Sequence, residues 1–223
     1  MSEGGRIVGL MKEQIMSNGL GWGVLAIVRL AFGMIRWKVL AYCLHAPGIN
    51  LGSACHLSGI RFIRFGKDVR ARSNLWLEAV TRYHGEDYSP QIIIGDRVMF
   101  SHAVHVGAIG SVRIGNDVLF GSNVLVTDHN HGAYAGSAHS SPEEPPALRH
   151  LRSLGEVVIE DNVWVGDNVN IVGPVRIGFG AVIGSNSVVR GDVPPRTLVA
   201  GVPARVRKTF DHNSTKWLSG ERN

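Results

Sequence analysis

The sequence predicts an all-β solenoid, a parallel β-helix of about six coils with three short strands per coil. Apolar residues recur every six positions over residues 159–194, whereas a helix repeats every ~3.6 residues and a single strand every ~2. A three-strand coil has this period if each strand places one large residue inside and glycine or asparagine forms the corners. Glycine supplies 28 of 223 residues, well above the usual ~7%, which indicates many tight turns.

The repeat is regular at two of its six positions. The first position is always β-branched: Ile159, Val165, Ile171, Ile177, Ile183 and Val189. The fifth is small or β-branched: Val163, Val169, Val175, Ala181, Ser187 and Val193. With insertions allowed, the same frame continues upstream through Ile94, Phe100, Val106, Ile114, Phe120 and Val126, and more weakly through Leu51, Leu57, Phe65, Ala71 and Leu77.

This pattern divides the chain into three parts. We expect the solenoid over residues 49–208, interrupted by a loop at 130–157 that contains three prolines and interrupts the repeat. Residues 1–48 are expected to be helical, with apolar residues at helical spacing. That segment either caps the open end of the solenoid or lies on a membrane surface. Residues 209–223 are expected to form a short C-terminal helix or tail.

Composition narrows the functional classes. The net charge of +5 favours an anionic partner, but there is no basic run or zinc spacing typical of nucleic-acid binding. The chain has two cysteines and no apparent signal peptide, so a cytoplasmic location is expected, with association to the inner face of the membrane as an alternative.

Three segments resemble a known family: "IEDNVWVGDNVNI", "IGFGAVIGSNSVVRGDVPP" and "LVAGVPARV". They are similar to the C-terminal half of the hexapeptide-repeat O-acetyltransferases, over residues 90–208. "TDHNHG" and the proline-rich loop after it resemble the branch that modifies capsule, O-antigen and exopolysaccharide. The resemblance implies a left-handed β-helix, a homotrimer with acetyl-CoA bound between subunits, a glycan acceptor and no metal.

Acetyl transfer to a sugar hydroxyl requires a base, and histidine, with a pKa of about 6.5, suits that task. The resemblance assigns this role to His129, with His131 as second choice on the same face of the strand. Asp128 has two interpretations, to orient the imidazole or to form a turn. Side-chain alternation in an extended segment favours the turn.

The resemblance also implies the remaining site residues. The backbone N–H groups around Gly166 and Asp167 would bind the oxyanion. The residues expected to contact acetyl-CoA are Trp164, Gly184, Ser185, Arg190, Arg205 and Lys208. Arg190 stands where the family usually has threonine, so that contact is altered. Trp164 occupies a position of the frame that should face outward, where either a neighbouring subunit or the pantetheine arm or acceptor sugar would cover it. Those expected to contact the acceptor are Ser101, His102, Asn130, Tyr134 and Arg149.

The sequence therefore predicts an acetyl-CoA-dependent O-acetyltransferase acting on a surface-polysaccharide sugar or its precursor by direct transfer. Two alternatives stay open. One is a zinc enzyme similar to γ-class carbonic anhydrases, with ligands among His102, His105, His129 and His131. The other is a non-catalytic β-helix scaffold.

Overall fold

The computed structural model describes residues 16, 38–135, 137 and 139–219. The chain divides into two compact units, 1–48 and 49–223. In the first unit residues 38–43 are helical, and the remainder of the expected amphipathic helix lies outside the described residues, as does any membrane contact it makes. Within the described ranges, no helix is long and apolar enough to cross a membrane.

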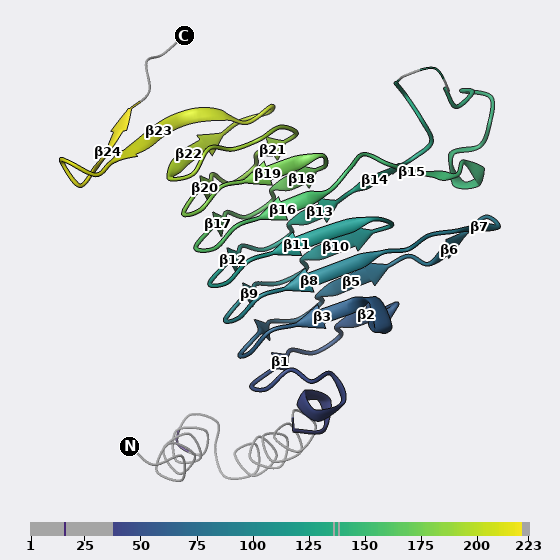
Figure 1. Cartoon of the computed structure of the whole chain (residues 1–223), viewed down its shortest axis with the longest axis horizontal. Coiled ribbons are helices and arrows are strands. Elements are labelled where there is room, and N and C mark those ends of the chain that lie inside the picture. Colours follow the sequence, from purple (N-terminus) through teal and green to yellow (C-terminus); the bar gives the residue numbers. More distant parts are fainter. Residues whose placement is uncertain (1–15, 17–37, 136, 138, 220–223) are drawn as a thin grey trace. The chain divides into compact units, whose positions relative to one another are not determined.

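The second unit consists mainly of three parallel sheets that the chain visits in turn, which makes it a β-helix (Figure 1). The nine-stranded sheet contains β1 (Asn50–Leu51), β4 (Arg70–Ala71), β9 (Met99–Phe100), β12 (Leu119–Phe120), β17 (Trp164–Val165), β20 (Val182–Ile183), β22 (Thr197–Ala200), β23 (Arg205–Asp211) and β24 (Lys216–Ser219). The six-stranded sheet contains β2 (His56–Ser58), β5 (Trp76–Ala79), β10 (His105–Ala108), β13 (Leu125–Thr127), β18 (Asn170–Val172) and β21 (Val188–Val189). The five-stranded sheet contains β3 (Ile63–Phe65), β8 (Gln91–Ile94), β11 (Ser111–Ile114), β16 (Val157–Ile159) and β19 (Val175–Ile177), and a 3-10 turn, η1 (Ile60–Phe62), precedes β3.

The six-residue frame sets both the core and the register between coils. Ile94 pairs with Ile114, which pairs with Ile159, which pairs with Ile177. All four side chains are at most 3% exposed. The predicted core frame is therefore confirmed across the insertions, because the buried residue of each strand stacks on that of the next coil.

Asparagine and glycine both form corners of the coils, and one glycine is also required by a close approach between coils. Asn123, Asn168 and Asn186 adopt positive φ angles of 57°, 57° and 60°, and their amides form a ladder with hydrogen bonds of 3.1 Å. By contrast, a Cβ on Gly166 would lie 2.7 Å from the Ser185 backbone nitrogen. Gly180, at the same position of the six-residue frame as Asn168 and Asn186, has a φ of 65°, so glycine also forms a corner of this kind, as predicted. Gly166 is needed for another reason, because the next coil passes too close for a side chain.

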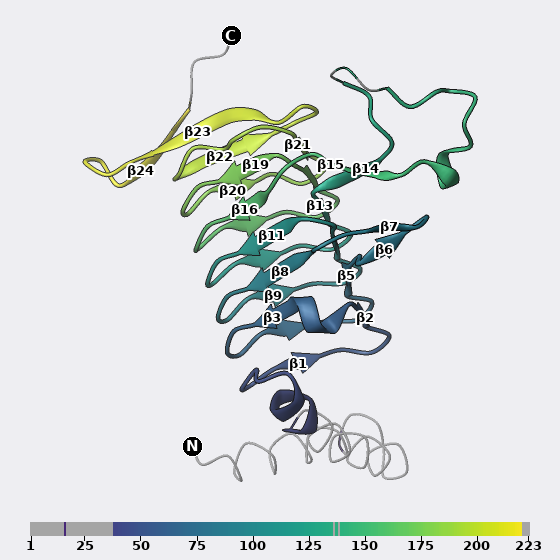
Figure 2. The same ribbon diagram turned by 45° about the vertical axis from the view of Figure 1, so that its right-hand side comes forward.

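Two excursions leave the coils on the same side of the solenoid (Figure 2). The predicted loop begins as an antiparallel pair, β14 (His129–His131) with β15 (Leu151–Ser153), and contains a second 3-10 turn, η2 (Pro146–Leu148). The other excursion, the hairpin β6 (Arg82–Tyr83) and β7 (Glu86–Asp87), was not predicted. It lies between Leu77 and Ile94, where the repeat was treated only as an insertion.

The predicted C-terminal helix or tail is wrong for the described residues up to 219. β22 pairs antiparallel with β23, which pairs antiparallel with β24. The proposed boundary at residue 208 falls inside β23. A hairpin forms here because residues 205–210 include Val206, Thr209 and Phe210, which favour strands, and the open edge of β22 supplies hydrogen-bonding partners.

Candidate active site

His129 lies where the chain leaves the six-stranded sheet for the loop. Its Nδ1 is 2.9 Å from Oδ1 of Asp128, and its side chain is 14% exposed. Asp128 lies in a bend between β13 and β14, so the alternation of side chains along a strand is interrupted there. The argument that placed the two side chains on opposite faces therefore does not apply.

Asp128 is completely buried. Besides the contact with His129, its carboxylate accepts hydrogen bonds from the backbone N–H groups of Ile109 at 3.0 Å and Gly110 at 2.8 Å. A buried carboxylate requires such compensation. The three donors fix its orientation, and with it the plane of the His129 ring.

The floor beneath His129 is Gly107 on β10. A Cβ at this position would lie 3.4 Å from Cε1 of His129 and 3.6 Å from Nε2 of His105. The two imidazoles therefore flank one glycine. On the neighbouring strand β5, Glu78 is the residue that pairs with Gly107. Its Oε2 lies 3.8 Å from Nε2 of His105.

The surroundings of His105 favour its neutral form. Burial lowers its pKa, with a smaller lowering from the charge of His129 and an opposing effect from Glu78. Its ring stacks on Trp76, with centroids 4.3 Å apart and planes 13° apart. His105 was predicted only as a candidate zinc ligand, because the proximity of two histidines 24 residues apart is visible only once the register between coils is known.

Tyr134 and Arg149 were expected to contact the acceptor, but their polar groups bind within the loop. Arg149 is only 8% exposed and donates to the Glu144 carbonyl at 2.7 and 3.0 Å and to the Tyr134 hydroxyl at 2.8 Å. That hydroxyl donates to the His131 carbonyl at 2.6 Å. The guanidinium thus holds the loop together.

The base of the loop lies against the β6–β7 hairpin. The Tyr83 hydroxyl donates to the Ala147 carbonyl at 2.7 Å, and the Tyr83 ring packs edge-on against His131 at 5.3 Å. The Tyr88 hydroxyl donates to Glu86 at 2.7 Å. Burial and the adjacent Glu86 raise the pKa of Tyr88 to about 12. Asn130, paired with Arg152, and His131, paired with Leu151, lie at this base, next to His129.

Four predicted site residues lie at another corner of the solenoid, between the nine-stranded and six-stranded sheets. Ser101 and His102 follow β9, while Gly166 and Asp167 follow β17. The Gly166 N–H donates to the Ile183 carbonyl at 2.8 Å, and the Asp167 N–H donates to the Ser185 hydroxyl at 3.2 Å. Only the Asp167 N–H, whose partner is a rotatable hydroxyl, can be released for an oxyanion without opening the sheet.

The small residues expected near the cofactor also have structural roles. A Cβ on Gly184 would lie 3.0 Å from that of Ala200 in the next coil, and Ser185 accepts the hydrogen bond from Asp167. Trp164 points outward as predicted and is 52% exposed. It stands in an outer column of the nine-stranded sheet with Leu119 and Met99, which are 41% and 48% exposed.

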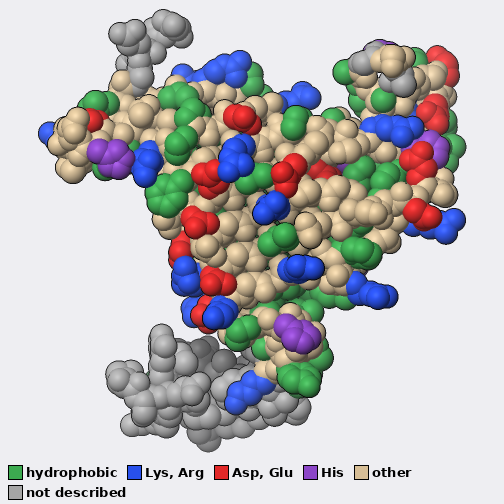
Figure 3. All heavy atoms as spheres, viewed as in Figure 1, with side chains coloured by type: hydrophobic (Ala, Val, Ile, Leu, Met, Phe, Trp, Pro, Cys, Tyr) green, Lys and Arg blue, Asp and Glu red, His purple; other side chains and the backbone are tan. Residues whose placement is uncertain are grey.

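The basic residues predicted to bind acetyl-CoA lie near the last coil. Arg190 and Arg205, 15 positions apart in sequence, line one cavity of about 410 Å³. Lys208 is exposed on β23. Figure 3 shows basic side chains interspersed with acidic ones on the face in view, so the net charge is not gathered into a single patch there.

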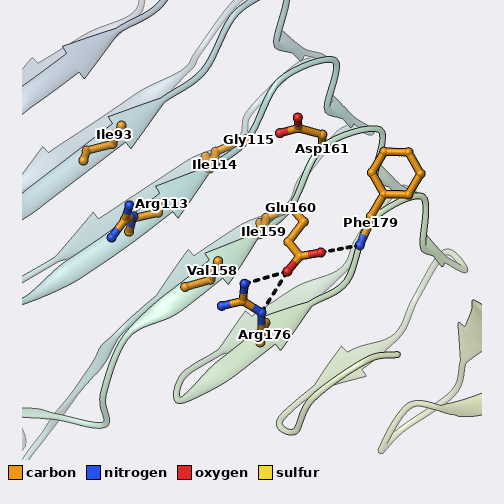
Figure 4. A pocket seen from close by; sticks show the side chains of 10 residues that line it. All are labelled: Ile93, Arg113, Ile114, Gly115, Val158, Ile159, Glu160, Asp161, Arg176 and Phe179. Carbon is orange, nitrogen blue, oxygen red and sulfur yellow. Dashed lines mark hydrogen bonds and ion pairs between the residues drawn. The ribbon is translucent and has the colours of Figure 1, made fainter. Parts of the chain in front are cut away.

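A further cavity of about 450 Å³ lies on the outer face of the five-stranded sheet (Figure 4). Its Arg176 contacts Glu160 at 2.7 Å, and Glu160 accepts the Phe179 N–H at 2.7 Å. None of the predicted site residues lines it. The cavity is therefore separate from the site around His129.

The zinc alternative requires at least three ligands around one ion, whereas only two of the four candidate histidines, His105 and His129, lie beside the same glycine. His102 lies at the corner between the nine-stranded and six-stranded sheets, where it is hydrogen-bonded to Ser73 at 2.7 Å. His129 lies at the base of the loop. Over the part of the chain that the structure describes, no three residues of the types that bind metals are placed to share an ion.

Comparisons with known proteins agree with the fold. Residues 156–191 match the family model "Bacterial transferase hexapeptide (six repeats)". The chain is 40% identical over 164 residues to the putative lipopolysaccharide biosynthesis O-acetyl transferase WbbJ of Escherichia coli K12, covering 73% of this chain and 80% of that protein. It is 32% identical over 138 residues to the galactoside O-acetyltransferase of the same organism, covering 60% of each.

Among solved structures, AntD, an N-acyltransferase from Bacillus cereus in complex with dTDP and 3-hydroxybutyryl-CoA, superposes with a TM-score of 0.61 at 19% identity. The match covers 76% of this chain and 84% of that one. At that identity the likeness concerns the fold alone.

These findings define an acyltransferase built on a hexapeptide β-helix. The chain belongs to the bacterial hexapeptide-repeat transferase family, in agreement with the expectation from the NVWVG and AGVPA segments.

Proposed function

We propose that this protein transfers an acetyl group from acetyl-CoA to a hydroxyl of a sugar in a surface polysaccharide or its precursor. The observation that carries the proposal is the contact of 2.9 Å between Asp128 and His129. Because Nδ1 carries the hydrogen donated to Asp128, Nε2 keeps its lone pair and is the basic atom. The names of the WbbJ and galactoside relatives support the transfer of an acetyl group to oxygen and the class of acceptor.

In the proposed reaction His129 Nε2 takes the proton of the sugar hydroxyl as its oxygen attacks the thioester carbonyl. The C–S bond then breaks, and the thiolate of CoA receives that proton from His129. The Asp167 N–H is the proposed donor to the oxyanion. No covalent enzyme intermediate is required.

We also propose a homotrimer with the left-handed coil of the family, and the placement of the residues supports the trimer. His129 lies where the chain leaves the six-stranded sheet, whereas Trp164 and Asp167 lie on or next to the nine-stranded sheet. A subunit boundary would bring the two groups together. The column of Met99, Leu119 and Trp164 also supplies exposed apolar surface for a neighbouring copy. Light scattering of the purified protein should give three times the chain mass of 24.1 kDa.

The decisive experiment is transfer of radiolabelled acetyl from acetyl-CoA to sugar glycosides by the wild type and by His129→Ala. Loss of the base should lower kcat by roughly 10²- to 10⁴-fold. His84→Ala, an exposed histidine at the tip of the β6–β7 hairpin, is the matched control and should leave kcat unchanged.

A variant His131→Ala separates the two histidine candidates. If it, rather than His129→Ala, abolishes transfer, the base is misassigned. Mass spectrometry of the cell-surface glycan with and without the gene should differ by one acetyl group per modified sugar. An unchanged glycan would remove the proposed acceptor.

A further inference from the structure

The outer face of the six-stranded sheet next to His129 carries groups that the proposed reaction does not use. Glu78 pairs in register with Gly107, which pairs with Thr127. Because these residues occupy one outward column on successive coils, about 4.8 Å apart, Glu78 lies one coil below the glycine under the His129 ring.

Glu78 has free capacity to accept hydrogen bonds. Its side chain is 34% exposed, so a ligand can reach the carboxylate. Its nearest polar neighbour is His105 Nε2 at 3.8 Å, a buried atom that itself has no hydrogen-bond partner among the described residues.

His105 is well placed to position Glu78. Trp76 stacks on its ring at 4.3 Å, and His56 contacts Trp76 edge-on at 5.8 Å. This aromatic column fixes the plane of the imidazole, so that Nε2 points towards Glu78 and the space over Gly107.

We propose that Glu78 is an acceptor-binding residue that receives hydrogen bonds from sugar hydroxyls next to the one acetylated, and that His105 positions it. The inference rests on the proposed function and adds the part of the site that selects the sugar. A carboxylate can accept from two neighbouring hydroxyls, and a ring seated over Gly107 would have one oxygen near His129 and others near Glu78.

The test is a double-mutant cycle in which one change is made in the enzyme, at Glu78, and the other in the acceptor, by removing one hydroxyl. The acceptors are methyl glycosides of glucose, galactose and rhamnose, with each monodeoxy analogue. With the wild type, loss of one or two particular hydroxyls should lower kcat/KM by roughly 10- to 100-fold, as expected for hydrogen bonds to a charged group. With Glu78→Ala, kcat/KM for the same deoxy analogues should equal kcat/KM for the parent glycosides.

Several measurements separate this role from a structural one. Glu78→Ala and Glu78→Gln should raise KM for the acceptor but leave KM for acetyl-CoA and the thermal midpoint unchanged. His105→Phe, which keeps the stack on Trp76, should also raise acceptor KM without lowering kcat. Ser58→Ala, in the same column one coil farther from His129, is the control and should behave as the wild type.

The two proposals fail in different ways. If the wild type acetylates glycosides but Glu78→Ala keeps the full penalty for every deoxy analogue, or raises KM for acetyl-CoA instead, the role of Glu78 is overturned while the proposed function stands. If the wild type acetylates none of the glycosides, the proposed function is overturned and the role of Glu78 with it.

Discussion

Asp128 Oδ1 lies 2.9 Å from Nδ1 of His129, its neighbour in sequence, and the same carboxylate accepts the N–H groups of Ile109 and Gly110 from the preceding coil. One side chain therefore joins two coils and orients the proposed base. A structural role and a proposed catalytic role therefore coincide at this position.

Asp128→Asn should separate those roles. The amide keeps the shape of the carboxylate but cannot accept from all three donors, so we expect kcat to fall roughly 10²-fold or more. Asp128→Ala leaves the buried donors without a partner and should lower the free energy of unfolding by about 2–5 kcal/mol. Steady-state kinetics and urea unfolding measure the two effects. A wild-type kcat in the folded asparagine variant would show that the contact is structural only.

Gly107→Val should displace His129. A Cβ at this position already reaches 3.4 Å from the imidazole, and the additional methyl groups of valine need space that the ring occupies. Valine favours strands, so the thermal midpoint should hold while kcat falls about 10-fold or more, because a small misplacement of a catalytic group costs much of the rate. Gly107→Ala, which makes only ordinary contacts, should be milder. Equal activity of both variants would contradict this geometry.

The half-buried His105 should make stability depend on pH. Burial lowers its pKa, the charge of His129 lowers it further and Glu78 opposes them, so the folded state favours the neutral ring. Its contribution to stability is complete above the unfolded pKa of about 6.5 and is lost as pH falls through the lower, folded pKa. The thermal midpoint of the wild type should therefore decrease more than that of His105→Phe between about pH 7.5 and 5.5. Parallel curves for the two proteins would show that His105 does not contribute.

Arg149→Ala should loosen the loop without unfolding the solenoid. The buried guanidinium donates to the Glu144 carbonyl and the Tyr134 hydroxyl, and its loss leaves those acceptors unpaired. We expect faster chymotrypsin cleavage near Tyr134 or Leu148, with intact core fragments. Arg152→Ala, whose side chain is 53% exposed, should be cleaved at the wild-type rate, and equal rates for all three proteins would count against this role for Arg149.

Much of the fold could be predicted because each six-residue block of the sequence corresponds to one strand and one corner of a coil. The positions of Ile94, Phe120 and Val165 in that frame predicted which side chains are buried, and the break after Val126 predicted the loop. The β6–β7 hairpin was missed because it falls within the weak upstream part of the frame, and the C-terminal hairpin because its pairing depends on the open edge of β22.

The sequence by itself determined the period, the buried positions, the family and the candidate base His129. The spacing of apolar residues gives the first two, and short sequence motifs give the other two. Only the tertiary structure decided that Asp128 turns towards His129, that Arg149 is used inside the loop, and that His105 and Glu78 lie beside the site. The physical reason is that the burial pattern follows from strand alternation. The direction of a side chain at a bend or in a loop, and its neighbour on the next coil, depend instead on contacts that the local sequence pattern does not contain.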